Sequence, residues 1–419
     1  MFVYVLNMHG EPLMPCKPRK ARKLLEEEKA KVVNRTPFTI QLLYGSSGYK
    51  QQVNLGVDAG SKYIGVSATT MDKELFKATV ELRQDISKLL ESRRSQRRNR
   101  RSKLWYRKPR FLNRRNRKGK VAPSVQNKID CHLTIIKKVC SMLPVVNIIV
   151  ETAEFDIHKL MNPEVSGKGY QEGDAAGFYN VKAAVLSRDN YTCQICGEKD
   201  SKLEVHHIQF RSKGGSNMMD NLVTLCRDCH KQIHSGELVF DKKIKSFKHA
   251  SHMNIMRSRL VEELRLEFGN VFETFGYLTK YNREQLGIEK SHSNDAFVIS
   301  HNFNAVRSGV EYCYRKIRRH NRQIHKAKPG KGGVRKRNQS RYIVNGFRRF
   351  DKVMYNGIEC FITGKRSSGY FQLKTFDGTV ISQSVSSKRL KLLEPIKGWL
   401  IDWMMAIPPR PKEVEVSLP

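Results

Sequence analysis

The sequence has no uninterrupted apolar stretch of about 20 residues, which is the length that a membrane-spanning helix requires. Its first residues run into a polar Asn-Met-His-Gly turn without a small-residue cleavage site, so we expect no secretory signal peptide. In such a chain, nine cysteines indicate thiols or metal ligands rather than a disulfide framework. These absences argue against a membrane protein and against a disulfide-stapled secreted domain.

Acidic residues are also scarce. Only 40 Asp and Glu oppose 77 Lys and Arg, so the formal charge is +37 over 419 residues, and the stretches 92–129 and 312–350 contain no acid at all. This charge would repel itself in a compact fold unless a polyanion neutralised it. Nucleic acid presents a dense line of phosphates, whereas binding to an anionic membrane would need a basic amphipathic helix with an aromatic face. We therefore expect a nucleic-acid partner and no membrane.

The length accommodates about two to four domains. Apolar periodicity predicts a helix over 124–143, and the lack of glycine and proline predicts one over 85–105. Further helices are expected over 21–31, 179–186, 251–267 and 294–300. It predicts strands over 2–6, 39–44, 74–82, 145–150 and 271–278, and a hairpin over 52–70. Short β-rich runs over 342–393 suggest a small C-terminal barrel, and the segment from Trp399 onward shows no assignable pattern.

Two Cys-x2-Cys pairs can point four thiolates at one tetrahedral zinc ion. They are formed by Cys193, Cys196, Cys226 and Cys229. The alternative is four unrelated buried thiols, which two matched pairs make a poor explanation. The spacing therefore predicts a structural zinc site.

Between and after these pairs lie adjacent histidines on a predicted strand, a glycine-rich turn and an i,i+4 histidine pair on a helix. The arrangement resembles the HNH nuclease motif in its ββα-metal form. The resemblance implies that His207 is the general base, that His206, His230 and His234 hold the catalytic ion, and that Asn221 fixes the loop that orients His207. A zinc-stapled DNA-binding finger whose histidines are all ligands is the alternative.

Carboxylates outside this unit also have a recognisable context. Asp58 and Glu151 sit on apolar strands, and His292 and Asp295 open a helix. In order and context they resemble the three split segments of a RuvC-like nuclease with an RNase H fold. The resemblance implies that Asp58, Glu151 and Asp295 are Mg²⁺ ligands and that His292 assists the attacking water.

Taken end to end, the chain resembles the IscB family, transposon-encoded relatives of the CRISPR effector nuclease. Residues 11–15 match the family's Pro-Leu-Met-Pro signature, and the stretch from Arg93 to Arg98 resembles its bridge helix. The resemblance implies an α/β multidomain chain with a split RuvC domain, an inserted HNH domain and a basic C-terminal domain. Its expected parts are the Pro-Leu-Met-Pro domain (1–50), RuvC segment I (51–84), the bridge helix (85–120), RuvC segment II (121–160), the HNH domain with linkers (161–245), RuvC segment III (246–312) and the C-terminal domain (313–419).

The same resemblance implies a function and its partners. It predicts an RNA-guided double-stranded DNA endonuclease in which the HNH site cuts the guide-paired strand and the RuvC site cuts the displaced strand. A structured guide RNA (ωRNA), target DNA, Mg²⁺ and zinc are the expected partners and cofactors of one protein copy in the prokaryotic cytoplasm. The expected nucleic-acid contacts are Arg93, Arg94, Arg97, Arg98, Arg100, Arg101, Arg318, Arg319 and Arg322.

Three other functions stay open at this point. A guide-independent HNH endonuclease of the homing or restriction type would need a protein surface that reads sequence. A junction resolvase would use the RuvC-like site alone. A non-enzymatic RNA-binding protein would explain the charge but not the carboxylates or the histidines.

Overall fold

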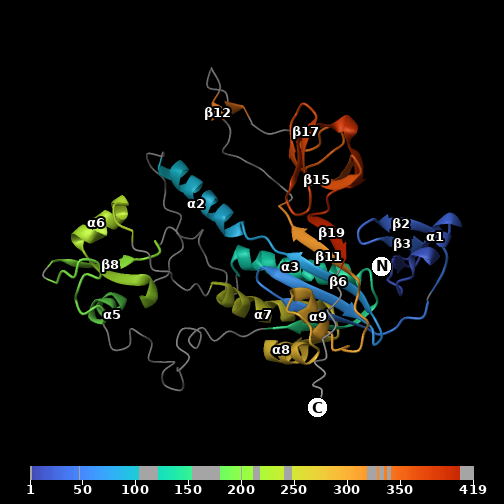
Figure 1. The fold of residues 1–419 in the computed structure, drawn as a ribbon, viewed down its shortest axis with the longest axis horizontal. Helices are drawn as coiled ribbons and strands as arrows, with labels where there is room; N and C mark the ends of the chain where they lie inside the picture. Colours follow the sequence, from blue (N-terminus) through green and yellow to red (C-terminus); the bar gives the residue numbers. More distant parts are fainter. Residues whose placement is uncertain are drawn as a thin grey trace, which may run out of the picture. The chain divides into compact units, whose positions relative to one another are not determined.

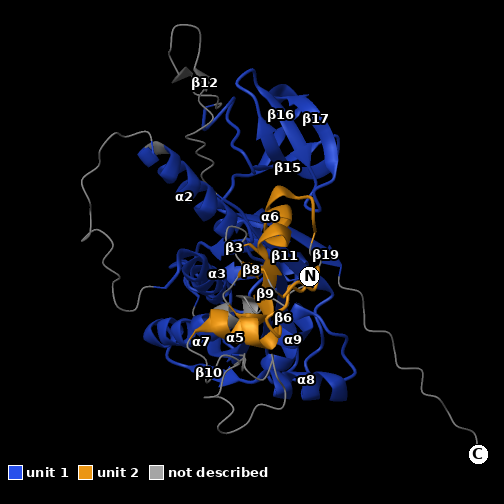
Figure 2. Ribbon diagram, turned by 90° about the vertical axis from the view of Figure 1, so that its left-hand side faces the viewer, with its two compact units in different colours: residues 1–154, 252–419 blue, residues 155–251 orange. Residues whose placement is uncertain are grey.

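The computed structural model describes residues 2–46, 48–102, 121–152, 180–199, 201–210, 218–239, 248–318, 328–329, 335–336 and 341–405. The chain divides into two compact units, Met1–Glu154 with His252–Pro419 and Phe155–Ser251, which Figure 2 separates by colour. None of the helices in the described part is long and apolar enough to cross a bilayer. The protein is therefore a mixed α/β chain of more than one domain, as the sequence predicts.

The first unit begins with a small three-stranded sheet in the order β1-β3-β2. Its elements are β1 (Tyr4–Leu6), α1 (Pro18–Glu26), β2 (Ala30–Asn34) and β3 (Thr39–Leu42). The helix expected over 21–31 starts earlier, because proline suits the first turn, and it ends at Glu26. Glu28 then takes a φ of 53°, and the chain enters β2, a strand that the sequence analysis missed.

The centre of the first unit is a seven-stranded sheet in the order β10-β7-β4-β5-β6-β11-β19 (Figure 1). Its strands are β4 (Val53–Ala59), β5 (Tyr63–Thr69), β6 (Glu74–Glu81), β7 (Val145–Glu151), β10 (Val271–Thr274), β11 (Val310–Lys316) and β19 (Trp399–Met405). β4, β5 and β6 are antiparallel neighbours, while β7 pairs in parallel with β4 and β11 with β6. Strands far apart in sequence thereby lie side by side.

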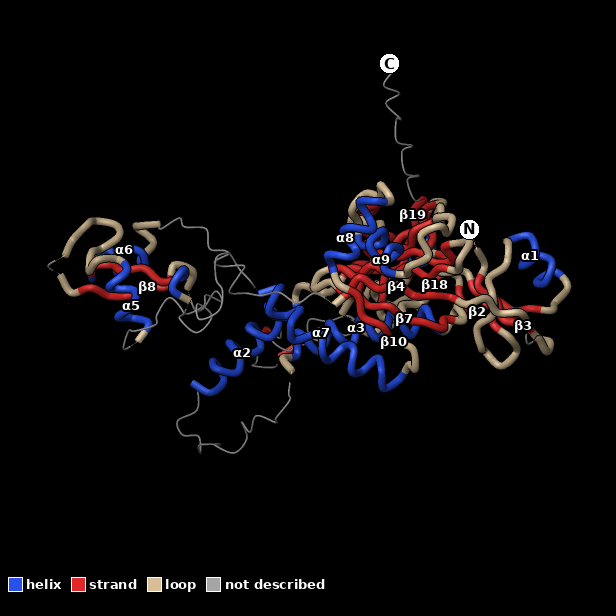
Figure 3. The backbone as a smooth tube through the Cα atoms, turned by 90° about the horizontal axis from the view of Figure 1, so that it is seen from below, coloured by secondary structure: helices blue, strands red, loops and turns tan. Residues whose placement is uncertain are grey.

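The two faces of this sheet differ, because successive residues of a strand point to opposite faces. On β4, Val53, Leu55 and Val57 belong to the main core, together with residues of α3 (Pro123–Cys140) and α7 (Lys248–Glu267). Gly56 and Asp58 alternate with them and meet α9 (His292–Ile299) on the other face. Figure 3 shows α3 and α7 on one side of the sheet and α9 with α8 (Gly276–Gln285) on the other.

Three observations correct the predicted boundaries. The extended segment expected over 271–278 ends at Thr274, and α8 begins two residues later. The domain boundary expected between residues 312 and 313 falls inside β11. β19, from the segment that the sequence left unassigned, pairs antiparallel with β11 and so belongs to the central sheet rather than to a separate C-terminal domain.

The rest of the C-terminal region forms a five-stranded antiparallel sheet in the order β17-β16-β15-β14-β18. Its strands are β14 (Lys352–Tyr355), β15 (Ile358–Lys365), β16 (Tyr370–Lys374), β17 (Val380–Ser386) and β18 (Lys391–Glu394), and a separate pair is formed by β12 (Lys328–Pro329) and β13 (Arg335–Lys336). Within the described strands, no recorded pairing joins the edge strands β17 and β18. Closure into a barrel therefore stays a prediction.

The second unit is small. It contains α5 (Val181–Arg188), the antiparallel pair β8 (Leu203–His207) and β9 (Leu222–Cys226), and α6 (Arg227–Ser235). Asp189 ties α5 to β9, because its carboxylate accepts a hydrogen bond from the backbone of Thr224 at 2.8 Å. The unit places its histidines and cysteines at the junction of β8, β9 and α6.

Candidate active sites

The four predicted zinc ligands come together in the second unit. The sulfur atoms of Cys193, Cys196, Cys226 and Cys229 all lie within 4.8 Å of one another. Although burial raises the pKa of the Cys193 thiol, backbone N–H groups led by that of Cys196 lower it to about 6. A thiolate among three further thiols at this spacing fits a tetrahedral zinc ion.

The predicted histidine ligands form a second cluster in the same unit. One ring nitrogen from each of His206, His230 and His234 lies within 4.8 Å of the others. The Nδ1 atom of His230 donates to Glu204 Oε2 at 2.6 Å, which leaves the Nε2 lone pair for a ligand. Burial, followed by the neighbouring imidazoles, lowers the pKa of His206 to about 4, so this ring is neutral at pH 7. Sequence reasoning missed Glu204.

His207 is not among the three imidazoles that meet. It follows His206 on β8, so its side chain leaves the strand on the opposite face. The buried Asn221 holds the loop that follows β8 through two hydrogen bonds to Gln209. Gln209 N donates to Asn221 Oδ1 at 2.8 Å, and Asn221 Nδ2 donates to Gln209 O at 3.2 Å. The glycine-rich turn at Gly214–Gly215 lies outside the described residues.

The carboxylates predicted in the first unit meet at the ends of two central strands. Asp58 of β4 is the register partner of Glu151 of β7, so both side chains leave the same face of the sheet. His292 Nδ1 lies 2.6 Å from Asp58 Oδ2, and Asp295 follows one turn later on the same helix. The structure therefore brings all four predicted residues to one place.

Two glycines permit this arrangement. A Cβ at Gly65 would lie 1.7 Å from His292 O, and one at Gly56 would lie 2.0 Å from Ala296 O. Only glycine lets α9 approach β4 and β5 this closely. The hydroxyl of Ser291 also caps the helix by accepting from Asn294 N at 3.1 Å. The sequence analysis treated both glycines as hairpin residues and missed their role.

Glu151 lies against α8. A Cβ at Gly276 would lie 3.0 Å from Glu151 Oε1, and Thr279 hydrogen-bonds the same carboxyl group. Burial, followed by the charges of Asp58 and Asp295 and despite the Thr279 bond, raises the pKa of Glu151 to about 7. Burial and then Asp58 also raise the pKa of Asp295, whose Oδ1 lies 3.0 Å from Arg283 Nε. Repulsion among these acids adds to the effect of burial, and a bound cation would relieve that repulsion.

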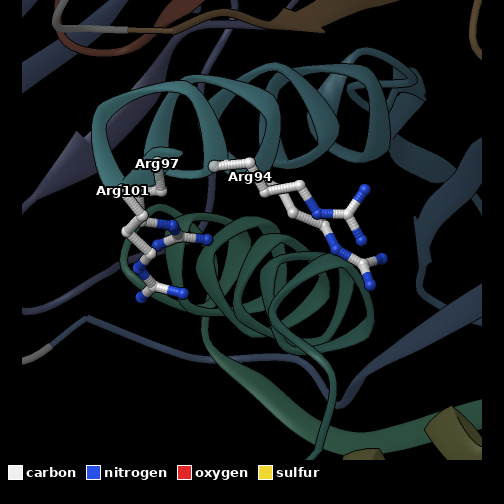
Figure 4. Close-up of a pocket in the computed structure, with 4 residues that line it drawn as sticks. Arg94, Arg97 and Arg101 are labelled. Atoms are coloured by element: carbon white, nitrogen blue, oxygen red, sulfur yellow. The ribbon is translucent and has the colours of Figure 1, made fainter. Parts of the chain in front are cut away.

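Of the predicted arginine contacts, Arg93, Arg94, Arg97 and Arg98 are exposed on α2 (Ile86–Ser102). Figure 4 shows Arg94, Arg97 and Arg101 projecting from this helix, where with Arg98 they line a pocket of about 450 Å³. Arg318 is half-buried after β11. The side chain of Arg100 and the whole of Arg319 and Arg322 lie outside the described residues.

Two families match the chain. One described as "RRXRR protein" matches residues 3–173, and one described as "HNH endonuclease" matches residues 193–236. Residues 97–101 read Arg-Arg-Asn-Arg-Arg, whereas the sequence analysis placed the arginine motif of the bridge helix at Arg93 to Arg98.

Similar proteins share only parts of the chain. Anaredoxin of Nostoc sp. is 42% identical over 57 residues, which cover 14% of this chain and 75% of that protein. The type IV methyl-directed restriction enzyme EcoKMcrA of Escherichia coli (strain K12) is 33% identical over 85 residues, which cover 18% of this chain and 29% of that enzyme. Streptococcus thermophilus Cas9 in complex with AGGA PAM aligns at 15% identity and a TM-score of 0.32, over 43% of this chain and 26% of its own.

Proposed function

We propose that the chain, whose residues 193–236 match the HNH endonuclease family, is an RNA-guided double-stranded DNA endonuclease of the IscB type. In this proposal the histidine cluster cuts the guide-paired strand and the carboxylate cluster cuts the displaced strand, in the prokaryotic cytoplasm. One observation carries the proposal: two chemically different clusters, each suited to phosphodiester hydrolysis, occupy two separate units of one chain.

In the second unit, the imidazoles of His206, His230 and His234 would hold a divalent cation. That cation would neutralise charge on the scissile phosphate and the leaving oxygen. Glu204 fixes the tautomer of His230, so that its free nitrogen turns toward the cluster. His207, the general base that the family resemblance implies, would accept a proton from the attacking water, while Asn221 holds the loop that follows it.

In the first unit, Asp58, Glu151 and Asp295 would hold Mg²⁺, because carboxylate oxygens are its preferred protein ligands. The bound ions would activate the attacking water and stabilise the leaving oxygen. The raised pKa of Glu151 supports this fit, since a cation would offset the burial, and then the repulsion from Asp58 and Asp295, that oppose its ionisation. His292 is oriented by Asp58 through Nδ1 and keeps Nε2 for a proton from water.

The arginines support the RNA partner. The exposed guanidinium groups of α2 outnumber nearby acids, because residues 92–129 contain none. Guanidinium groups bind phosphate in pairs of parallel hydrogen bonds, and contacts to phosphate carry no sequence information. Sequence choice would then come from base pairing with a guide, whose duplex is held through its backbone.

The test uses the protein purified with the RNA transcribed beside its gene, and a plasmid that carries the matching target. We expect wild type with Mg²⁺ to linearise the plasmid, His207→Ala to nick only the displaced strand, and Asp58→Ala to nick only the guide-paired strand. His9→Ala, an exposed histidine in the N-terminal sheet region, is the matched control and should cut both strands. Equal cleavage of the plasmid by RNA-free protein would refute the proposal that an RNA guides cleavage.

A guide-independent endonuclease of the restriction type is the second candidate. The observation that favours it is the 33% identity to EcoKMcrA over 85 residues. In that case the purified, RNA-free chain should cut DNA at sites set by its own surface, and Asp58→Ala should leave both strands cut. The same plasmid assay therefore separates the two functions.

A further inference from the structure

The first unit contains a pocket of about 470 Å³ whose lining includes none of the residues of either cluster. Its walls come from three segments: residues 81–89 at the end of β6 and the start of α2, residues 315–318 at the end of β11, and Arg349 with Phe350 before the C-terminal sheet. Ligand sites of proteins commonly have volumes of about 300–1,000 Å³, which spans a single nucleotide.

The pocket carries excess positive charge. Its two acids are each paired with their own arginine, since Asp85 makes two bonds of 2.9 Å with Arg83 and Glu81 binds Arg315. Lys316, Arg318 and Arg349 are left without a carboxylate partner among the described residues. Lys316 packs over the Trp399 ring at 4.2 Å, and Arg349 donates to Thr363 O at 2.7 Å.

Arg349 and Phe350 are held rigidly. Asp351 is 1% exposed, and its carboxylate accepts from Arg348 N at 2.7 Å and from Ile396 N at 2.8 Å. Phe350 has a φ of 75°, a strained backbone for a bulky residue, and its ring stacks under the Arg349 guanidinium at 4.5 Å. Strain that the surrounding contacts maintain is found most often at binding and catalytic sites.

We propose that this pocket binds one nucleotide of the bound nucleic acid, with its phosphate on Arg318 and Arg349 and its base against Phe350. Guanidinium groups match phosphate oxygens in paired hydrogen bonds, and aromatic rings stack with any base. The inference rests on the proposed function, which supplies a nucleic-acid strand in this unit. The strand is RNA or DNA, because both offer this phosphate and base chemistry.

The test titrates the full-length chain with 2-aminopurine riboside 5′-monophosphate, its deoxyribose counterpart and inorganic phosphate. We expect saturable quenching of the base fluorescence and at least a tenfold loss of affinity in Arg318→Met/Arg349→Met. In Phe350→Ala we expect loss of the quenching but retained binding of inorganic phosphate, measured by calorimetry. Arg19→Met/Arg22→Met on α1 removes the same charge elsewhere and should bind like wild type. Arg349→Lys, with a melting curve for each variant, separates loss of binding from loss of fold.

Equal quenching in the pocket double variant and the α1 double variant would overturn the inference. The source of the nucleotide follows from ultraviolet crosslinking of the assembled ribonucleoprotein with its target, because the mass added at Phe350 distinguishes ribose from deoxyribose. A chain that carries no RNA and cuts no guided target would instead refute the proposed function. Guided cleavage together with an unchanged pocket variant would refute this inference alone.

Discussion

The histidine and carboxylate clusters are built in opposite ways. All seven ligand-bearing residues of the zinc and histidine clusters lie in the short stretch from Cys193 to His234, on one turn, one strand pair and one helix. The carboxylate cluster draws on Asp58, Glu151 and Asp295, which only a seven-stranded sheet brings together. The first design depends on ligand chemistry, and the second depends on the packing of a large core.

The cores of the two units follow the same contrast. The buried clusters of the second unit contain few apolar side chains, and three of its buried residues are the cysteines Cys193, Cys226 and Cys229. The first unit buries whole faces of β4, β5 and β6 under α3 and α7. Small cores need a metal or another crosslink for stability, whereas large ones do not. The second unit should therefore be disrupted by loss of a metal ligand, and the first unit by a change in its packing.

The largest effect is expected from loss of a zinc ligand. Cys229→Ser should abolish zinc binding and unfold the second unit, because structural zinc contributes about 10–16 kcal/mol of apparent binding free energy at pH 7. The first unit should keep its fold. Zinc content by mass spectrometry and hydrogen exchange resolved by unit measure the two outcomes. Cys16→Ser, a half-buried thiol of the N-terminal sheet, is the control. Full zinc content in Cys229→Ser would contradict the assignment of Cys229 as a zinc ligand that stabilises the second unit.

The reciprocal change is Gly65→Ala in the first unit. Its Cβ would meet His292 O at 1.7 Å, so α9 must shift away from the sheet. Overpacking of this kind costs about 3 kcal/mol and should displace His292 from Asp58. We expect loss of cleavage of the displaced strand with unchanged cleavage of the guide-paired strand. Gly309→Ala, where a Cβ meets nothing within 4 Å, should leave both strands cut. Retained cleavage in Gly65→Ala would show that the close approach is unnecessary.

The same contrast explains which parts of the two sites could be predicted from the sequence. The spacing of the cysteines and of His230 and His234 predicts a local cluster, because one helix and two turns fix their distances. The strand order that pairs Asp58 with Glu151 does not follow from local periodicity and was not predicted; only a family resemblance placed the two acids in one site. β19 was unassigned, because its pairing partner β11 lies about 90 residues away.

Residues around the ligands were harder to foresee. Thr279 and Arg283 were missed because α8 follows β10 after a single residue, and its start was mistaken for a continued strand. Gly56 and Gly65 carry no signal of their own, since a glycine in a strand also suits a bulge or a turn. Their role depends on a helix that arrives more than 200 residues later.

A smaller effect is expected from pH on the first unit in the absence of divalent cations. Burial raises the pKa of Glu151 from an ordinary value of 4.5 to about 7. Between these values the folded protein holds a proton that the unfolded chain has lost, so the free energy of unfolding falls as pH rises from 4.5 to 7. Thermal melts of the first unit should show this fall, and Mg²⁺ should reverse it more at pH 8 than at pH 5. In Glu151→Gln the free energy of unfolding should change less with pH. An unchanged pH dependence would show that a group other than Glu151 causes it.

The smallest effect concerns the ring beside His292. Tyr63 stacks on His292 with ring centroids 5.4 Å apart and an interplanar angle of 28°, so it restrains the imidazole that Asp58 orients. Aromatic pairs contribute about 0.5–1.5 kcal/mol beyond their buried area, which corresponds to about a 2–10-fold change in rate. Tyr63→Leu should slow cleavage of the displaced strand by this factor at saturating DNA, while Tyr63→Phe keeps the stack and the rate. The guide-paired strand, which the proposed function assigns to the other unit, is the internal control in the same reaction tube. Equal slowing of the cleavage of both strands in Tyr63→Leu would show that the ring acts on DNA binding rather than on His292. It would also contradict the independence of the two clusters.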